Sequence, residues 1–203
     1  GIAAGDVDGD GDLDLLIANN AGTGSVSVRL NDGNGLTYTN APTLTGLVFP
    51  IAPVLGDLDS DGDLDLVVCS NLSGAAVTSV FLNNGTGTFS NGGSIATGVA
   101  NIDAALADFD NDGDLDVLTA NIGSNTVSVQ LNNGSGTFSS GPAVTVGNRP
   151  CAISAGDFDG DGDLDFVTAN NVTPGSLSFR FNNGNATFTG SANAASGNQP
   201  LSV

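Results

Sequence analysis

A nine-residue acidic segment occurs four times in this chain, and its regular spacing constrains the fold more than any other feature. The copies start at residues 6, 57, 108 and 157, and each has Asp at positions 1, 3, 5, 7 and 9 and Gly at position 6. A period near 50 residues is too short for one unit to bury a core alone, so we expect similar units that pack on one another. Together they form a single repeat domain, 1–203, with units near 1–49, 50–100, 101–149 and 150–203.

Each unit contains signals for four short β-strands. A small apolar run leads into the acidic segment, and a β-prone run follows it at Leu13–Ala18, Leu64–Cys69, Leu115–Ala120 and Leu164–Ala169. The third signal is the alternation of a strand with one buried face, found at Val26–Leu30, Val127–Leu131 and Leu177–Phe181. An Asn-Asn-Gly or Asn-Asp-Gly sequence then predicts a tight hairpin into a strand that carries Tyr38, Phe89, Phe138 or Phe188.

Four strands in about 50 residues are the content of one propeller blade. The sequence therefore predicts an all-β fold, a β-propeller-type array of four four-stranded antiparallel blades. The acidic segment is expected to be the loop between the first two strands of each blade. No segment has the 3.6-residue apolar periodicity of an amphipathic helix.

The acidic loops have the composition of a cation site. Alternating Asp residues bring carboxylates toward one point, Gly at position 6 permits a sharp turn, and position 7 offers a backbone oxygen. Such an all-oxygen set suits Ca²⁺, which tolerates irregular geometry, better than Mg²⁺. The loops are not EF-hands, because position 12, where an EF-hand has a bidentate Glu, is Ile17, Val68, Thr119 or Thr168. We predict about four calcium ions, one per loop.

All Asp residues of the four loops are predicted to bind metal. Positions 1, 3, 5 and 9 are expected to use their side chains. Position 7 is expected to use its backbone oxygen and to point its side chain to solvent. The predicted residues are Asp6, Asp8, Asp10, Asp12 and Asp14; Asp57, Asp59, Asp61, Asp63 and Asp65; Asp108, Asp110, Asp112, Asp114 and Asp116; and Asp157, Asp159, Asp161, Asp163 and Asp165.

Charge and composition argue against several function classes. The net charge is −19 with only three basic residues, so a nucleic-acid partner is not expected. No apolar run is long enough for membrane insertion. The chain has no His and no Glu, and its Asp residues are explained as ion ligands, so we expect no enzyme activity. With no Trp and only Tyr38 as a tyrosine, the alternative of a carbohydrate-binding propeller lectin has little support.

Other residues are given structural interpretations. Cys69 aligns with alanines of the other units and is expected to be a small buried residue, without a bridge to Cys151. Arg29 and Arg180 are expected to be exposed strand residues. The recurrent Phe89, Phe138 and Phe188 are expected to pack between blades.

Two segments resemble the FG-GAP/VCBS repeat family, the integrin-like propeller blades. They are GDFDGDGDLDFVTAN at Gly156–Asn170 and VSVQLNNGSGTF at Val127–Phe138. The resemblance implies calcium in the loop between the first two strands of each blade, at the rim of a propeller, in secreted or surface-exposed proteins. Such propellers usually have seven blades. This chain has four units and starts at Gly1 without Met. Three architectures therefore stay open: a closed ring, a fragment of a seven- or eight-bladed propeller, and units along a fibre.

These features predict a non-catalytic, calcium-stabilised structural and interaction module for adhesion or filament formation. The expected partners are other protein subunits or surface glycans, and self-assembly is possible in so polar an array with few Lys or Arg residues. Loops that bind calcium at micromolar to millimolar affinity fill outside the cell, so we expect an extracellular location, secreted or at the cell surface.

Overall fold

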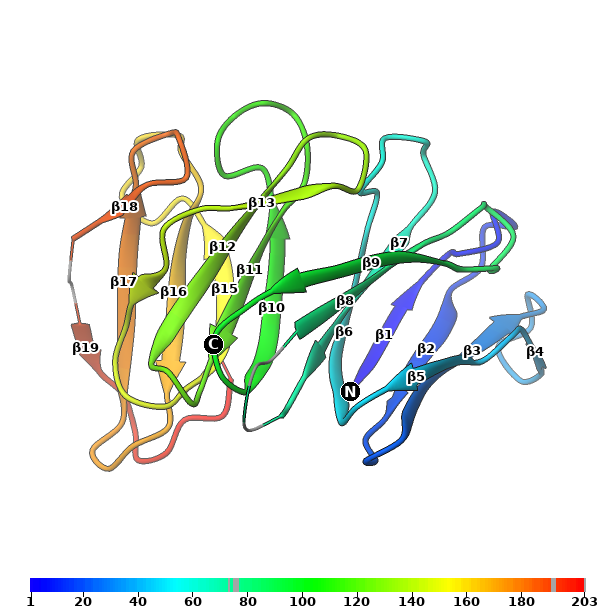
Figure 1. Ribbon diagram of the computed structural model, residues 1–203, viewed down its shortest axis with the longest axis horizontal. Helices are drawn as coiled ribbons and strands as arrows, with labels where there is room; N and C mark the ends of the chain where they lie inside the picture. The colour runs from blue at the N-terminus through cyan, green and yellow to red at the C-terminus, as the bar shows by residue number, and fades with distance from the viewer. Residues whose placement is uncertain (73, 75–76, 191–192, 203) are drawn as a thin grey trace.

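The computed structural model describes residues 1–72, 74, 77–190 and 193–202, and these residues form 19 β-strands in four antiparallel sheets. We call the sheets blades 1 to 4 (Figure 1). Blade 1 contains β1 (Ile2–Gly5), β2 (Asp14–Asn19), β3 (Gly24–Asn31), β4 (Tyr38–Asn40) and β5 (Leu44–Leu47). Blade 2 contains β6 (Pro50–Gly56), β7 (Asp65–Ser70), β8 (Val77–Leu82) and β9 (Ser90–Ala96).

The last two blades follow the same plan. Blade 3 contains β10 (Asn101–Ala107), β11 (Asp116–Asn121), β12 (Thr126–Asn132), β13 (Phe138–Ser140) and β14 (Val144–Thr145). Blade 4 contains β15 (Pro150–Gly156), β16 (Asp165–Asn170), β17 (Ser176–Asn182), β18 (Phe188–Thr189) and β19 (Asn193–Ala195). Within the described residues no helix is present that could cross a membrane.

In each blade the strands are hydrogen-bonded in sequence order, as a meander. The fourth strand is continuous only in blade 2, where β9 pairs with β8 along its whole length. In the other blades this strand is divided into two short pieces that pair with the same neighbour, for example β13 and β14 on β12. The prediction of four antiparallel blades is confirmed, whereas the divided outer strands were not predicted.

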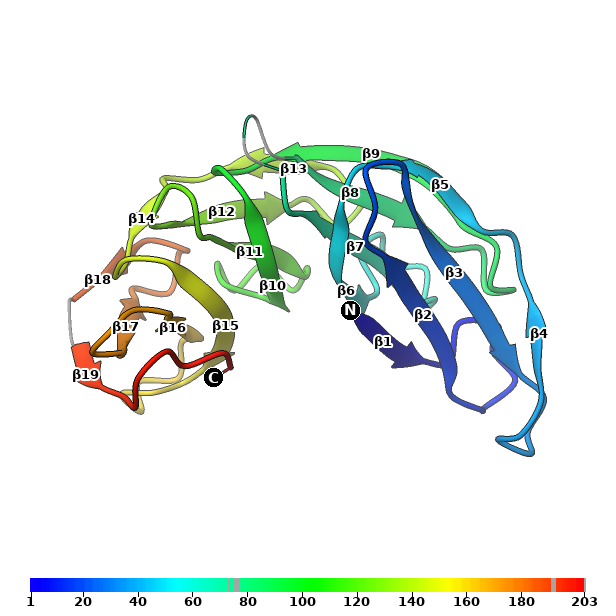
Figure 2. The same ribbon diagram turned by 90° about the horizontal axis from the view of Figure 1, so that it is seen from below.

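The blades lie side by side along an open arc, with β1, β6, β10 and β15 on the concave side (Figure 2). We call the face of a blade that meets the following blade its downstream face, and the opposite face its upstream face. Alternating residues of the central strands fill three junctions. The junction of blades 1 and 2 buries Leu16, Val26 and Val28 against Leu66, Val68 and Phe81. The next two bury Val67 and Val80 against Val117, and Leu118, Val127 and Val129 against Phe166.

Hydrogen bonds to a backbone carbonyl of the acidic loop reinforce each junction. The carbonyl at loop position 2 of one blade accepts two hydrogen bonds from the hairpin of the next blade. At the first junction the Val7 oxygen accepts from Asn83 Nδ2 at 2.8 Å and from the Gly87 N–H at 2.7 Å. The same pair of bonds reaches Leu58 from Asn132 and Gly136, and Phe109 from Asn182 and Ala186. Each of the first three acidic loops is therefore held by its own blade and by the following one.

The structure confirms several of the structural interpretations. Cys69 is fully buried, and neither Cys69 nor Cys151 forms a disulfide. Phe89, Phe138 and Phe188 pack against the three inter-blade clusters. These residues could be predicted correctly because they occupy positions that are equivalent in every unit.

The prediction of an exposed Arg180 is wrong. Arg180 lies on the upstream face of β17, where blade 3 covers it, and its Nε and Nη2 both donate to the Thr145 carbonyl, at 3.0 and 2.7 Å. At the equivalent position of blade 3, Gln130 Nε2 donates to the Ala96 carbonyl at 2.8 Å. Sequence alignment identified the shared strand position, but not the neighbouring blade that buries it.

Asp103, one of the two Asp residues outside the acidic loops, joins the last two blades. It lies on β10, and its Oδ2 accepts a hydrogen bond from the Ile153 N–H of β15 at 2.9 Å. Burial raises the pKa of this carboxyl above its ordinary value. Its ionised form is therefore less favourable in the folded chain than in the unfolded chain.

The junction hydrogen bonds predict a specific loss of stability. Asn132→Ala removes the donor to the Leu58 carbonyl and also the bond to the Leu115 carbonyl. We expect the free energy of unfolding in urea to fall by about 1–3 kcal/mol, because the Leu58 carbonyl loses one of its two donors and the Leu115 carbonyl loses its bond to the same side chain. Asn133→Ala is the matched control, since this exposed side chain accepts from Ser135 within its own turn. Equal losses in the two variants would contradict a stabilising role for the junction bonds.

The raised pKa of Asp103 predicts a pH dependence. Between the ordinary carboxyl pKa and the raised one, the folded chain binds more protons at this site than the unfolded chain does. The contribution of Asp103 to stability therefore falls as the pH rises through this window and is level above it. Asp103→Asn removes the titrating group but keeps an oxygen for the Ile153 N–H. Between about pH 4 and about pH 7, its free energy of unfolding in urea should decline less steeply with pH than that of the wild type. Asp32→Asn, at an exposed turn, should keep the wild-type slope.

Candidate calcium centres

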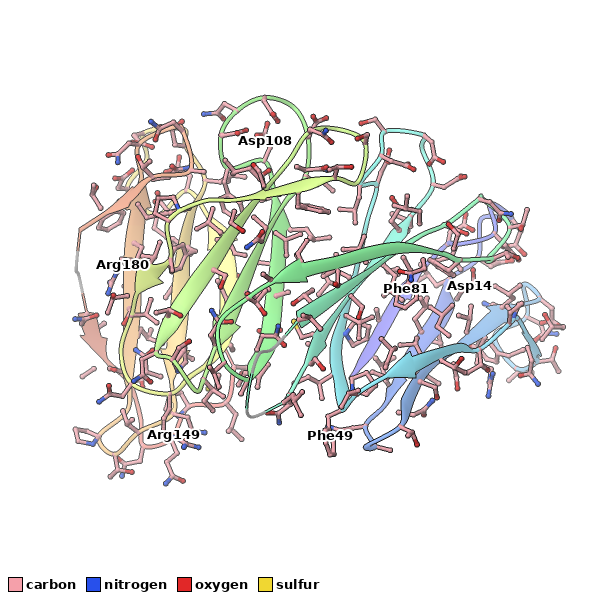
Figure 3. The ribbon with its side chains drawn as sticks, viewed as in Figure 1. Asp14, Phe49, Phe81, Asp108, Arg149 and Arg180 are labelled. Carbon is pink, nitrogen blue, oxygen red and sulfur yellow. The ribbon has the colours of Figure 1, made fainter. Side chains whose placement is uncertain are left out.

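The four acidic loops connect the first and second strands of their blades and lie at one rim of the array. Figure 3 shows Asp108 at this rim, whereas Phe49 and Arg149 lie at the opposite one. In every loop the sequence places Asp at the first residue after the first strand and again at the start of the second strand. The strand pair therefore fixes both ends of the loop.

Left-handed backbone positions give the loops their sharp turns. The predicted Gly at position 6 has a φ of 93° at Gly11 and Gly62 and of 98° at Gly113 and Gly162. Position 4 is also left-handed, and here the sequence uses Gly9, Ser60, Asn111 and Gly160, with φ values of 77°, 62°, 62° and 83°. Small or turn-forming residues at position 4 are a sequence signal for this second turn. The prediction from sequence did not use that signal.

The Asp at position 9 is fully buried in every loop and satisfies two backbone donors. In blade 3, Asp116 Oδ2 accepts from the Phe109 N–H at 3.0 Å and Oδ1 accepts from the Asn132 N–H at 2.8 Å. Burial raises the pKa of Asp116, and likewise that of Asp65 in blade 2, to about 6, although these backbone donors oppose the shift. Equivalent bonds occur at Asp14, Asp65 and Asp165. Position 9 therefore ties the loop to the hairpin of its own blade.

Two other positions organise the loop backbone. Position 1 accepts the N–H of the position 6 Gly in all four loops, as at Asp6, whose Oδ2 lies 2.9 Å from the Gly11 nitrogen. Position 5 accepts the N–H of position 7, as at Asp10, whose Oδ1 lies 2.9 Å from the Asp12 nitrogen. These bonds use one carboxylate oxygen at position 5 of each loop.

Position 3 differs in the first three loops, because its carboxylate has a buried oxygen that no protein donor reaches; in the fourth loop Asp159 Oδ1 accepts the Asp161 N–H at 3.3 Å. Within the described part of the chain, the Oδ1 atoms of Asp8, Asp59 and Asp110 are buried without a hydrogen-bond partner, and so is Oδ1 of Asp57 at position 1. Desolvation raises the pKa of Asp8, Asp59 and Asp110, and neighbouring carboxylates raise it further. A buried anionic oxygen without a donor is stabilised by a cation.

The loops bring the predicted residues together in clusters of three. One oxygen from each member lies within 4.8 Å of the others in Asp6, Asp8 and Asp10, and in Asp57, Asp59 and Asp61. In the last two loops the clusters are Asp108, Asp110 and Asp116, and Asp157, Asp159 and Asp165. Taken together, these clusters use positions 1, 3, 5 and 9, and their hard oxygen donors fit Ca²⁺.

Position 7 lies apart from these clusters and does not extend into solvent. Its side chain is half-buried against the hairpin glycine of the same blade: a Cβ on Gly134 would come within 2.6 Å of Asp114 Oδ2. The same contact joins Asp12 to Gly33, Asp63 to Gly85 and Asp163 to Gly184. The expectation of solvent-directed side chains at this position is therefore wrong, because the hairpin folds back over the loop.

The first Asn of each hairpin is a functional residue that sequence reasoning missed. Its backbone N–H binds position 9 of its own blade, and in blades 2 to 4 its side chain binds the position 2 carbonyl of the preceding blade. The repeated Asn31, Asn83, Asn132 and Asn182 were interpreted only as turn residues. Their alignment in all four units was the available signal.

Comparison with known families agrees with this arrangement. The FG-GAP-like repeat model matches three overlapping spans, 6–68, 57–119 and 108–168, each of which runs from one acidic loop into the next blade's second strand. The chain belongs to the FG-GAP-like repeat family. The resemblance inferred from the two sequence segments is thus confirmed. No curated protein sequence matches the chain.

The FG-GAP-like array also has a structural counterpart. It superimposes with a TM-score of 0.66 and 14% identity on a chain from the crystal structure of BBS1N in complex with ARL6DN, soaked with mercury. The match covers 98% of this chain and 58% of that one. At this identity the likeness establishes the shared fold, and the FG-GAP-like chain spans just over half of the other chain's length.

The division of roles within an FG-GAP-like loop predicts different effects of two isosteric substitutions. Asp116→Asn places an amide donor against the Phe109 or Asn132 N–H, so we expect a loss of about 1–3 kcal/mol in the free energy of unfolding, measured in urea with a chelator. Asp112→Asn, which is exposed and keeps an acceptor for the Asp114 N–H, should change stability by less than about 0.5 kcal/mol. Similar losses would argue against a distinct structural role for position 9.

Proposed function

We propose that this chain is an extracellular, calcium-stabilised structural and interaction module without catalytic activity, used in adhesion or ordered assembly. The observation that carries the proposal is the recurrence, in neighbouring loops, of buried carboxylate oxygens without protein donors, inside clusters of three Asp side chains. Calcium would be held by side chains at positions 1, 3, 5 and 9, and its role is to neutralise and cross-link the loop.

Electrostatics supports about four ions. The chain carries a net charge of −19, and four divalent cations would reduce it to −19 + 8 = −11. Twenty Asp residues lie in only four loops, so most of the relieved repulsion is local. In calcium-free solution this repulsion acts directly on the loop whose carbonyl binds the next blade.

The junction geometry supports a structural role for the ion. Loop position 2 lies between Asp residues at positions 1 and 3, and its carbonyl accepts two hydrogen bonds from the following blade. A cation that fixes the carboxylates on both sides also fixes this carbonyl. Calcium would therefore stiffen the array across blades as well as within each loop.

The grooves of the array suit interaction better than catalysis. Two shallow grooves of about 380 Å³ lie on the outer strands, one beside Phe81 and Asn91 and one beside Gln130 and Ser140. Among the described residues, neither groove is lined by an acidic or basic side chain, so neither presents an acid–base pair. Open, uncharged surfaces of this kind fit protein subunits or surface glycans. An extracellular location is proposed because millimolar calcium fills low-affinity loops there.

Calcium removal is the direct test of the proposal. We expect millimolar calcium to raise the melting temperature and protease resistance of the chain, and a chelator to reverse both effects. When the free calcium concentration is 100 times the dissociation constant of a site, binding at that site adds about 2.7 kcal/mol to the free energy of unfolding. Equal melting temperatures with calcium and with chelator would overturn the structural-ion part of the proposal.

A position 3 variant distinguishes a ligand from a folding residue. Asp110→Asn removes a charge from a buried oxygen with no protein donor, so the calcium-free chain should become more stable while the calcium-induced rise in melting temperature becomes smaller. Asp32→Asn makes the same charge change at an exposed turn and should leave the calcium-induced rise intact. Calorimetric titration with calcium should give one fewer binding event for the first variant only.

A further inference from the structure

The third and fourth acidic loops are joined directly by a side chain of the third loop. The two loops lie side by side at the upper edge of Figure 1, between β10 and β11 and between β15 and β16. Asn111, at position 4 of the third loop, donates from its Nδ2 to Asp163 Oδ1 at 2.9 Å and to the Gly184 carbonyl at 3.3 Å. Asp163 is position 7 of the fourth loop, and Gly184 is the hairpin glycine against which it packs.

Both ends of this contact lie next to proposed calcium ligands. Asn111 stands between Asp110 and Asp112, which are positions 3 and 5 of the third loop. Asp163 is the residue whose backbone oxygen is predicted to bind the ion of the fourth loop. A cation that fixes Asp110 and Asp112 also restricts Asn111, and through its hydrogen bond it restricts Asp163. This hydrogen bond is charge-assisted, because its acceptor is a carboxylate.

A second link between the same two loops runs through Asn182, the buried first Asn of the blade 4 hairpin. Its Nδ2 donates to the Phe109 carbonyl at 2.7 Å and to the Leu164 carbonyl at 3.1 Å. Phe109 is position 2 of the third loop, and Leu164 is position 8 of the fourth. The Asn182 N–H also donates to Asp165 Oδ1, at position 9 of the fourth loop, at 2.8 Å. One buried residue therefore binds groups that flank the ligands of both loops.

The second and third loops share only the second kind of link. Asn132 Nδ2 donates to the Leu58 carbonyl of the second loop and to the Leu115 carbonyl of the third. At position 4 of the second loop, Ser60 has the same φ of 62° as Asn111, but its side chain makes no hydrogen bond to another described residue. The junction of blades 3 and 4 therefore has an additional contact between its two loops.

We propose that calcium binding at one acidic loop strengthens binding at the neighbouring loop, and that the third and fourth loops are the most strongly coupled pair. This inference rests on the proposed function, because it takes the acidic loops as calcium sites. Asn111 and Asn182 act as positioning residues, since neither is a predicted ligand. A first ion orders the contacts that both loops share, so the second ion has fewer groups to order when it binds. The effect is reciprocal, so each loop changes the affinity of the other by the same factor.

Charge acts in the opposite sense to these links. Each loop carries five Asp residues, so a divalent ion changes the formal charge of a loop from −5 to −5 + 2 = −3 and reduces its attraction for the next ion. This effect acts through solvent and is screened over about 8 Å at about 0.15 M salt. The contacts of Asn182 are buried or partly buried, and salt screens such contacts much less. Coupling through the links should therefore be measurable at this ionic strength.

The position 6 glycines allow occupancy to be measured loop by loop. In every loop the N–H of this glycine donates to the position 1 carboxylate, a predicted ligand, so its NMR signal reports on its own ion site. The experiment is a calcium titration of the isotope-labelled full chain at about 0.15 M salt. It gives a separate midpoint concentration for each loop, read at Gly11, Gly62, Gly113 and Gly162.

Removal of one site tests the coupling. Asp110→Asn removes a ligand of the third loop, and the midpoint at Gly162 in the fourth loop should then rise about fivefold or more relative to the wild type. Asp59→Asn makes the same change in the second loop and should raise the midpoint at Gly113 in the third loop by a smaller factor. Circular dichroism and melting of both variants show that they are folded.

The outcomes separate this inference from the proposed function. An unchanged midpoint at Gly162 in Asp110→Asn overturns the coupling, although calcium still binds and the proposed function stands. An effect at Gly113 in Asp59→Asn that equals or exceeds the effect at Gly162 overturns the assignment of the strongest pair. No calcium-dependent shift at any of the position 6 glycines of the wild type overturns the proposed function together with this inference.

A matched pair of position 4 variants tests the role of Asn111. Asn111→Gly and Ser60→Gly each remove a side chain at a φ of 62°. Asn111→Gly should raise the midpoint at Gly162 about threefold, as expected for the loss of one hydrogen bond, whereas Ser60→Gly should leave the midpoint at Gly113 unchanged. In an Asp110→Asn chain, whose third loop is empty, Asn111→Gly should have a smaller effect at Gly162. An equal effect in both backgrounds would mean that Asn111 only shapes the fourth loop, and would overturn its part in the coupling.

Discussion

The whole array depends on one buried carboxylate per blade and the Asn that it holds. The Asp at loop position 9 accepts the N–H of the first hairpin residue, and in blades 2 to 4 the side chain of that residue binds the preceding blade's loop. The position 9 carboxylate and the first Asn of the hairpin thus join a loop, its hairpin and the neighbouring blade. Since both oxygens of the carboxylate are satisfied, its burial is tolerated where an unpaired charge would not be.

The acidic loop uses most of its Asp residues for folding and leaves some carboxylate oxygens for the proposed cation. Positions 1, 5 and 9 accept backbone N–H groups, and position 7 lies on the hairpin glycine. Position 3 keeps a buried oxygen without a protein donor in three of the loops. A cation there would compensate buried oxygens that no protein donor reaches, including Asp57 Oδ1 at position 1 of the second loop. Because the carbonyl at position 2 binds the next blade, the ion site and the blade junction share the same backbone.

Much of this could be predicted because the repeat aligns equivalent positions four times. The strand pattern, the hairpins, the buried Cys69 and the aromatic residues between blades all follow from periodicity in the sequence. The errors concern residues whose surroundings come from elsewhere in the chain. Arg180 is buried because blade 3 covers it, and Asp114 turns inward because a hairpin returns over its loop. No local pattern contains those neighbours.

The sequence by itself determined the fold class, the number of blades and the loops that gather the negative charge, since these depend on local periodicity and on Asp and Gly at fixed spacing. Only the tertiary structure decided which carboxylates are used by backbone donors and which retain a buried oxygen for a cation. It also decided that the four blades pack side by side along an arc. The first outcome depends on how each loop folds onto its own hairpin, through bonds between residues as far as 18 positions apart. The second depends on contacts between residues 50 to 76 positions apart, which form only when the blades pack together.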